Sequence, residues 1–228
     1  MSKDYEPIPI PDHISKGEGE MRAAAEAFRA EMGRRHTVRD FATTPVPRAV
    51  IDDCVAAAGL APSGANHQPW HFVAISDPKI KAEIRRAAEE EEERFYAGAA
   101  GDEWLSALEP IGTGVSKPHL EDAPWLIVIF AQRYGLREDG SRFKHYYVPE
   151  STGIASGFLI AALHHAGLSC LTHTPAPMNF LRDICGLPEH EKPIMILAVG
   201  HAAADATVPQ SAKKKKPLSE IMTVLSED

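Results

Sequence analysis

The sequence of 228 residues has only three cysteines, and none of them is in a spacing typical of metal sites or disulfide frameworks. Cys54, Cys170 and Cys185 are an odd set without a CxxC pair. We therefore expect neither a disulfide framework nor a thiolate zinc site, and we expect a reducing compartment. The adjacent His164 and His165 would point to different sides of a helix, so we assign no metal to the protein.

Positive charge and long apolar runs are also scarce. The formal net charge of -8 excludes general affinity for nucleic acid, which depends on many Lys and Arg side chains to neutralise phosphates. No apolar run reaches membrane length, and the N-terminus, with Pro7, Pro9 and Pro11, has no apolar core for a signal peptide. We expect a cytoplasmic protein with a small-molecule partner and no membrane contact.

The best-known catalytic motifs are missing as well. There is no GxGxxG after a strand, no GxxxxGK[ST], no HExxH and no GxSxG. These absences exclude the well-marked nucleotide-binding, zinc-protease and serine-hydrolase classes.

Helical and strand patterns alternate along the chain without repeats or a break in composition, which predicts a central sheet flanked by helices. The expected helices are 20–34, 50–59, 79–96 and 153–167, and the expected strands are 70–75, 125–131, 169–174 and 194–199. We expect an N-terminal extension at 1–19 and a single domain at 20–228 that includes a C-terminal tail. The helix 153–167 is apolar on nearly every face, so it should be buried in the domain or against a second copy.

Two neighbouring segments suggest a phosphate-bearing cofactor. The first, 34–39, contains three arginines and a threonine, which offer bidentate donors suited to phosphate. The second, 61–70, contains Pro-Ser-Gly-Ala, which lets backbone N–H groups approach a planar ligand closely. Taken alone, either segment could be an ordinary helix end or loop. Because both occur within one short stretch, we favour the cofactor.

These segments resemble the FMN-binding signatures of the nitroreductase superfamily. The ordered set Glu92, Tyr96 and Lys117, with further matches between residues 20 and 222, resembles the iodotyrosine deiodinase branch. The resemblance implies an α+β, nitroreductase-like fold, an intertwined homodimer, and FMN sites built by both subunits. It also implies an external electron donor, either NAD(P)H or a reductase.

The resemblance assigns roles to particular residues. The expected cofactor-binding residues are Arg35, His36, Thr37, Arg39, Pro62, Ser63, Gly64, Thr172, His173, Thr174 and Lys215. Thr174 would also be catalytic, donating its hydroxyl hydrogen bond to N5 of the flavin. The expected substrate-binding residues are Ala65, Glu92, Tyr96 and Lys117. In two places the sequence departs from the family, because His36 and Lys215 stand where arginines are usual, and Lys213–Lys216 equally suits a solvated charge run.

The three residues of the deiodinase set suit an amino-acid zwitterion. Glu92 can bind an ammonium group and Lys117 a carboxylate, and Tyr96 lies on the same helical face as Glu92 because they are four residues apart. Without the resemblance, the five consecutive glutamates 89–93 would be typical of a solvated helix end. We expect FMN-dependent reductive dehalogenation of halotyrosines. The alternatives are an NAD(P)H-dependent nitroreductase or flavin reductase acting on nitroaromatics or quinones, and a flavin-binding module without turnover.

Overall fold

The computed structural model describes residues 5–99 and 101–226, and the chain divides into two units, one ending at Arg35 and one beginning at His36. The first unit contains helix α1 (Glu18–Gly33), which confirms the helix predicted there. At its start the Gly17 amide donates a hydrogen bond of 2.9 Å to the Glu20 carboxylate, so the first turn is capped. The predicted boundary after residue 19 and the single domain from residue 20 stay predictions.

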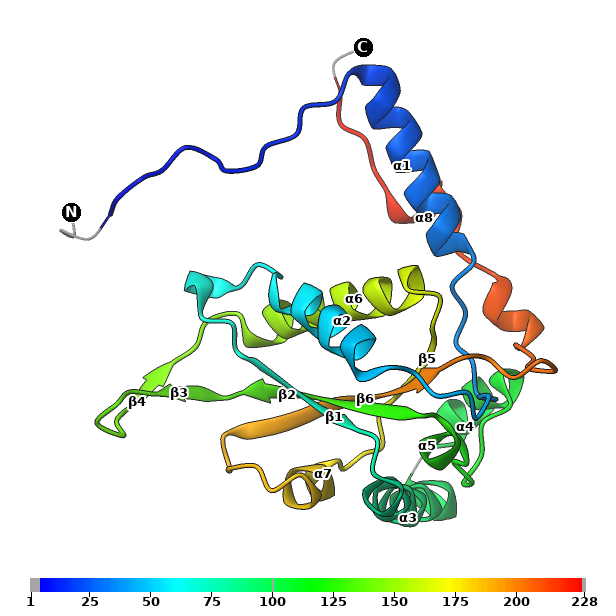
Figure 1. Cartoon of the computed structure of the whole chain (residues 1–228). Coiled ribbons are helices and arrows are strands. Elements are labelled where there is room, and N and C mark those ends of the chain that lie inside the picture. The colour runs from blue at the N-terminus through cyan, green and yellow to red at the C-terminus, as the bar shows by residue number, and fades with distance from the viewer. Residues whose placement is uncertain (1–4, 100, 227–228) are drawn as a thin grey trace. The chain divides into compact units, whose positions relative to one another are not determined.

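The centre of the second unit is a four-stranded antiparallel sheet with the strand order β1-β2-β6-β5 (Figure 1). Its strands are β1 (Trp70–Ile75), β2 (Trp125–Gln132), β5 (Ser169–His173) and β6 (Glu191–Gly200). All four strands expected from the sequence are therefore present. Strand β6 begins three residues before the start of the predicted strand 194–199. It includes Pro193, which lies opposite Phe130, where the pairing register of β2 with β6 shifts.

Side chains of the two central strands alternate between two hydrophobic cores. Leu126 and Val128 of β2 belong to the core that is shared with α3 (Pro78–Arg94) and α7 (Asn179–Ile184). Ile127 and Ile129 belong to the core formed with α2 (Arg48–Gly59) and α6 (Val148–His165) on the other face. Figure 1 shows these two helical layers on opposite faces of the sheet. A sheet buried on both faces explains why β2 is apolar almost throughout.

The helix α3 carries the residues of greatest interest for function. The Asp77 carboxylate caps it by accepting hydrogen bonds from the Lys79 amide at 2.7 Å and the Ile80 amide at 3.3 Å, and Pro78 occupies the first helical position. The α-helix ends at Arg94, two residues before the predicted end, and continues as one π-helical turn, Phe95–Ala99.

Several short elements were not predicted from the sequence. They are η1 (Gly64–Asn66), α4 (Asp102–Leu108), η3 (Glu109–Ile111), α5 (His119–Asp122), the hairpin β3 (Tyr134–Leu136) and β4 (Arg142–Lys144), α7, η4 (Gln210–Lys213) and α8 (Leu218–Ile221). Of these, α4 and η3 follow the π-helical turn along the chain.

The apolar helix α6 is buried on one face only. Leu159 and Leu163 are fully buried, whereas Ile154 and Phe158 are exposed. Within one chain only the inner face is therefore buried, and burial of the outer face against a second copy stays a prediction. Among those residues, no helix is both long and apolar enough to cross a membrane.

Candidate functional site

A cavity of about 240 Å³ lies beside the C-terminal part of α3 and the end of β5. It is lined by Arg39, Glu91, Glu92, Phe95, Tyr96, Trp104, Leu108, Ile111, Thr113, Lys117, His119, Leu171, Thr172, His173, Thr174 and Ala176. The structure therefore brings three of the four expected substrate-binding residues together with four of the expected cofactor-binding residues.

The charged pair at this cavity is Glu92 with Lys117. The Lys117 Nζ lies 3.1 Å from the Glu92 carboxylate, and the two side chains are 4% and 14% exposed. Lys117 Nζ also donates hydrogen bonds to the Thr113 hydroxyl at 3.1 Å and to the Gly114 carbonyl. Because these charges are nearly desolvated, their attraction is stronger than that of a surface ion pair. For the same reason, either charge that lost its partner would favour a ligand group of opposite charge.

Tyr96 completes the set on the same side of the helix. Its hydroxyl donates a hydrogen bond of 3.2 Å to the Thr113 carbonyl. Burial raises the pKa of Tyr96, and the negative charge of Glu92 raises it further. The phenol therefore stays protonated at neutral pH and remains a hydrogen-bond donor.

Two buried histidines, His119 and His173, line the cavity. The rings of His119 and His173 meet edge to face with centroids 5.5 Å apart, and neither Nε2 atom has a hydrogen-bond partner in the described residues. Burial, reinforced by the charges of Lys117 and Arg39, lowers the pKa of His119 to about 4. Burial, reinforced by His119 and Lys117, lowers the pKa of His173 to about 3. Both rings are thus neutral at pH 7, and the fixed positive charges of the cavity remain those of lysine and arginine.

The second part of the arginine-containing segment 34–39 lies beside the sheet and leads to the cavity. The Val38 amide bonds to the Cys170 carbonyl, and Thr37 forms a parallel bridge with Cys170, so the chain runs beside the start of β5. This placement brings Arg39 to the cavity, where its guanidinium makes no hydrogen bond or ion pair with another described residue. Such an unpaired guanidinium is suited to a phosphate.

Other expected phosphate-binding residues do not line the cavity. His36 and Thr37 belong to the second unit and are half-buried. Arg35 is the last residue of the first unit, where its amide bonds to the Met32 carbonyl. Lys215 is exposed and follows η4.

The loop Pro62–Ala65 also lies away from the cavity. Figure 1 shows the loop after α2 at the opposite end of the sheet from α4 and α5. The Gly64 amide donates to the Ser151 hydroxyl at 3.2 Å, and a Cβ on Gly64 would lie 2.5 Å from the Tyr146 carbonyl oxygen. Only glycine therefore permits this approach to the start of α6.

The end of that loop has an unusual backbone. Ala65, Asn66 and Gln68 have φ values of 53°, 54° and 48°, in the left-handed region. The Ser63 hydroxyl stabilises this conformation by accepting a hydrogen bond of 2.9 Å from the Gln68 amide. Three non-glycine residues in this region cost free energy, and such strain is concentrated at functional loops.

Sequence reasoning missed several residues at the cavity. His119 was not identified, because nothing in the sequence relates it to His173. The aromatic pair Phe95 and Trp104, with ring centroids 4.9 Å apart, forms another wall of the cavity. In the described residues, no group of three or more His, Cys, Asp or Glu side chains could hold a metal ion.

Comparison with known proteins identifies relatives over nearly the whole chain. The model of the nitroreductase family matches residues 32–201. An iodotyrosine deiodinase of Haliscomenobacter hydrossis is 50% identical over 197 residues, which cover 86% of this chain and 89% of the relative. Iodotyrosine deiodinase 1 of Homo sapiens is 41% identical over 224 residues, which cover 98% of this chain and 76% of the relative.

Solved structures agree with these matches. A crystal structure of oxidized iodotyrosine deiodinase bound to FMN and 3-iodo-L-tyrosine superimposes with a TM-score of 0.70 at 29% identity. The match covers 88% of this chain and 100% of that chain. A BluB-like flavoprotein from Clostridium difficile reaches a TM-score of 0.64 at 20% identity, over 87% of this chain and 98% of that chain, and supports the fold alone.

Proposed function

Because the chain belongs to the nitroreductase family and, within it, to the iodotyrosine deiodinases, we propose that it uses FMN to remove halogen reductively from halotyrosines. The products are tyrosine and halide. The observation that carries this proposal is the convergence of Glu92, Tyr96 and Lys117 on one cavity. A nitroreductase or flavin reductase has no need of such a set, because its substrates carry no zwitterion.

The ion pair of Glu92 and Lys117 has the charges that an amino-acid zwitterion complements. When the substrate inserts between them, its ammonium binds Glu92 and its carboxylate binds Lys117, so that one ion pair is replaced by two. The phenol of Tyr96, which lies beside the pair, provides a further hydrogen bond. Together these groups fix the orientation of the aromatic ring that carries the halogen.

The residues around the cavity fit FMN. The unpaired Arg39 guanidinium suits its phosphate, the two orphaned Nε2 atoms of His119 and His173 can bond polar atoms of a heterocycle, and Thr174 offers a hydroxyl at the cavity edge. When bound and reduced by the external electron donor, FMN would supply the two electrons of the reaction. With one proton, they replace the carbon–halogen bond by a carbon–hydrogen bond, and the halogen leaves as halide.

A homodimer is part of the proposal, because one chain leaves the site incomplete. The loop Pro62–Ala65 lies at the other end of the sheet, so a second copy must provide the Ala65 amide that donates to the substrate phenolate. The exposed Ile154 and Phe158 of α6 support such an assembly, since burying them against a partner removes apolar area from water. We further propose a cytoplasmic location, where NAD(P)H or a reductase supplies the electrons.

The purified protein is expected to be yellow and to release about one equivalent of FMN per chain on denaturation, because each protomer contributes one copy of every binding residue. Absorbance near the flavin band and chromatography of the released cofactor measure this. Release of FAD, or a colourless protein that does not take up added FMN, would contradict the cofactor assignment.

Activity separates the proposed function from the reductase alternative. We expect iodide release from diiodotyrosine with dithionite as the electron source, at a rate well above that of nitroaromatic reduction. Nitroaromatic reduction without iodide release would favour the nitroreductase function. Binding of FMN and iodotyrosine with no turnover under these reducing conditions would favour a sensing module.

Thr174 is expected to act on the reaction and not on cofactor retention. Its side chain lines the cavity and is exposed, so Thr174→Ala removes one neutral hydrogen bond without leaving a buried void. FMN content should be unchanged, whereas iodide release should slow about fivefold, because one hydrogen bond contributes about 1 kcal/mol. Equal rates in Thr174→Ala and wild type would remove Thr174 from the catalytic assignment.

A further inference from the structure

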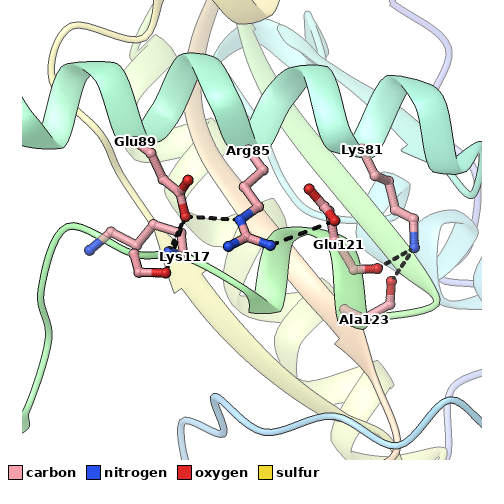
Figure 2. A network of polar contacts seen from close by, with 7 residues as sticks. Lys81, Arg85, Glu89, Lys117, Glu121 and Ala123 are labelled. Atoms are coloured by element: carbon pink, nitrogen blue, oxygen red, sulfur yellow. Dashed lines mark hydrogen bonds and ion pairs between the residues drawn. The ribbon is translucent and has the colours of Figure 1, made fainter.

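One face of α3 is polar and holds the segment Ser116–Ala123, which contains Lys117 and His119 of the cavity. Lys81, Arg85 and Glu89, spaced four residues apart, project from this face toward the segment (Figure 2). Lys81 Nζ donates to the carbonyl oxygens of Glu121 and Ala123 at 2.8 and 2.7 Å. Arg85 lies 3.6 Å from the Glu121 carboxylate. The segment is thus fixed to the helix at several points.

Glu89 makes the contact nearest to the cavity. A single oxygen of its carboxylate, Oε1, accepts hydrogen bonds from the Lys117 amide at 2.6 Å and from Arg85 Nε at 2.9 Å, with Ser116 Oγ at 3.4 Å. Burial raises the pKa of Glu89, but the Lys117 amide and the Arg85 guanidinium outweigh this effect and hold the pKa below its ordinary value. Glu89 is therefore a charged acceptor at neutral pH.

Two residues of α3 contact Lys117, one through its backbone and one through its side chain. Its amide bonds to Glu89, and its ammonium group pairs with Glu92, about one helical turn further along. The helix that presents the carboxylate for a substrate ammonium consequently also sets where the lysine for the substrate carboxylate stands. The helix thus fixes the Lys117 backbone beside Glu92, and the two side chains separate from their ion pair when a zwitterion inserts between them.

We propose that Glu89, oriented by Arg85, is a positioning residue that fixes the Lys117 backbone beside Glu92, so that both side chains can bind the same amino-acid zwitterion. This inference rests on the proposed function of the cavity. Glu89 does not line the cavity, so it acts through the Lys117 backbone. Recognition of the amino-acid part of the substrate, and not of its phenol, depends on it.

The helix provides a matched control in the pair Arg86 and Glu90. This pair has the same spacing and the same distance of 2.9 Å between its charged atoms, but its side chains are 65% and 53% exposed. Glu90 makes no contact with the segment that carries Lys117 among the described residues. Glu90→Ala therefore removes an equal charge and an equal helix pair without the contact that the proposal requires.

The test measures ligand binding to the FMN-loaded protein by quenching of flavin fluorescence. Glu89→Ala is expected to weaken 3-iodotyrosine binding about ten- to thirtyfold, because the Lys117 backbone is no longer fixed beside Glu92. Binding of 2-iodophenol, which has no zwitterion, should change less than about twofold, and Glu90→Ala should bind both ligands as wild type does. Glu89→Gln, which keeps an oxygen acceptor for the Lys117 amide, should restore most of the affinity.

A double variant separates positioning from general damage to the fold. In the Lys117→Gln background, Glu89→Ala should change 3-iodotyrosine affinity by less than about twofold, because the group that Glu89 positions is absent. Equal losses for 3-iodotyrosine and 2-iodophenol, or an undiminished loss in that background, would overturn the inference. So would wild-type affinity in Glu89→Ala. Failure of the wild-type protein to bind 3-iodotyrosine at all would instead contradict the proposed function.

Discussion

Replacing Glu92 by glutamine is expected to weaken iodotyrosine binding about a hundredfold, because the substrate ammonium loses its charged partner in a nearly desolvated site, at a cost of about 2 to 4 kcal/mol. The Glu92 side chain is only 14% exposed, so water cannot replace the carboxylate effectively. Lys117 would keep its bonds to Thr113 and Gly114, and the cavity should hold its shape. The variant thus removes one charge and little else.

Glu93→Gln is the matched control for this experiment, since it makes the same change at the next residue, where the side chain is exposed. Titration of flavin fluorescence should give wild-type affinity for Glu93→Gln with iodotyrosine. For 2-iodophenol, all three proteins should agree within about twofold, because this ligand presents no ammonium group. Similar iodotyrosine affinities in Glu92→Gln and wild type would refute the zwitterion role and favour the nitroreductase alternative.

The sequence predicted the main elements where hydrophobic periodicity is strong. The apolar run of β2 and the small-residue helix α6 were found because burial on a sheet face imposes a clear pattern. The hairpin β3–β4 was missed because its strands have three residues each and carry charges. In the structure it is stabilised by contacts across the hairpin, such as Arg142 over the Tyr134 ring at 4.2 Å, which no local pattern indicates.

The exposed face of α6 illustrates a different limit. The apolar pattern predicted a helix buried in the domain or against a second copy, and Ile154 and Phe158 face away from the core of their own chain. A sequence records that a surface is apolar without recording whether the same chain or a second copy covers it.

The candidate site was predictable only in part. The four-residue spacing of Glu92 and Tyr96 places both on one helical face, and the resemblance linked them to Lys117, with which they share a cavity in the structure. The position of Glu89 could not be singled out among five consecutive glutamates. Which of them faces the segment after residue 115 depends on the rotation of α3 in the fold, and Glu89 is 26% exposed where Glu90 is 53% exposed.

Acidification from pH 7 to pH 5 is expected to lower the free energy of unfolding by roughly 3 to 4 kcal/mol through His119 and His173 alone, since one pKa unit corresponds to about 1.4 kcal/mol. Folding lowers the pKa of His119 to about 4 and that of His173 to about 3, from an ordinary value of 6.5. Between these values the unfolded chain binds protons that the folded protein does not bind. Stability is therefore fully present above about pH 6.5 and is lost as the pH falls toward 4 and below.

Chemical denaturation of the FMN-loaded protein at several pH values, with FMN in constant excess, measures this loss. His119→Gln and His173→Gln should each show about half of the wild-type decrease between pH 7 and pH 5, whatever their stability at pH 7, because glutamine does not titrate. His13→Gln, at an exposed histidine with no resolved role in the cavity, should keep the full decrease. Besides burial, the charges of Lys117, Arg39 and Arg85 lower the pKa of His119, whereas the charge of Glu89 raises it. If both buried-site variants lose as much stability on acidification as the wild type does, the two rings are not held neutral, and the positive charge of the cavity does not come from Lys117 and Arg39 alone.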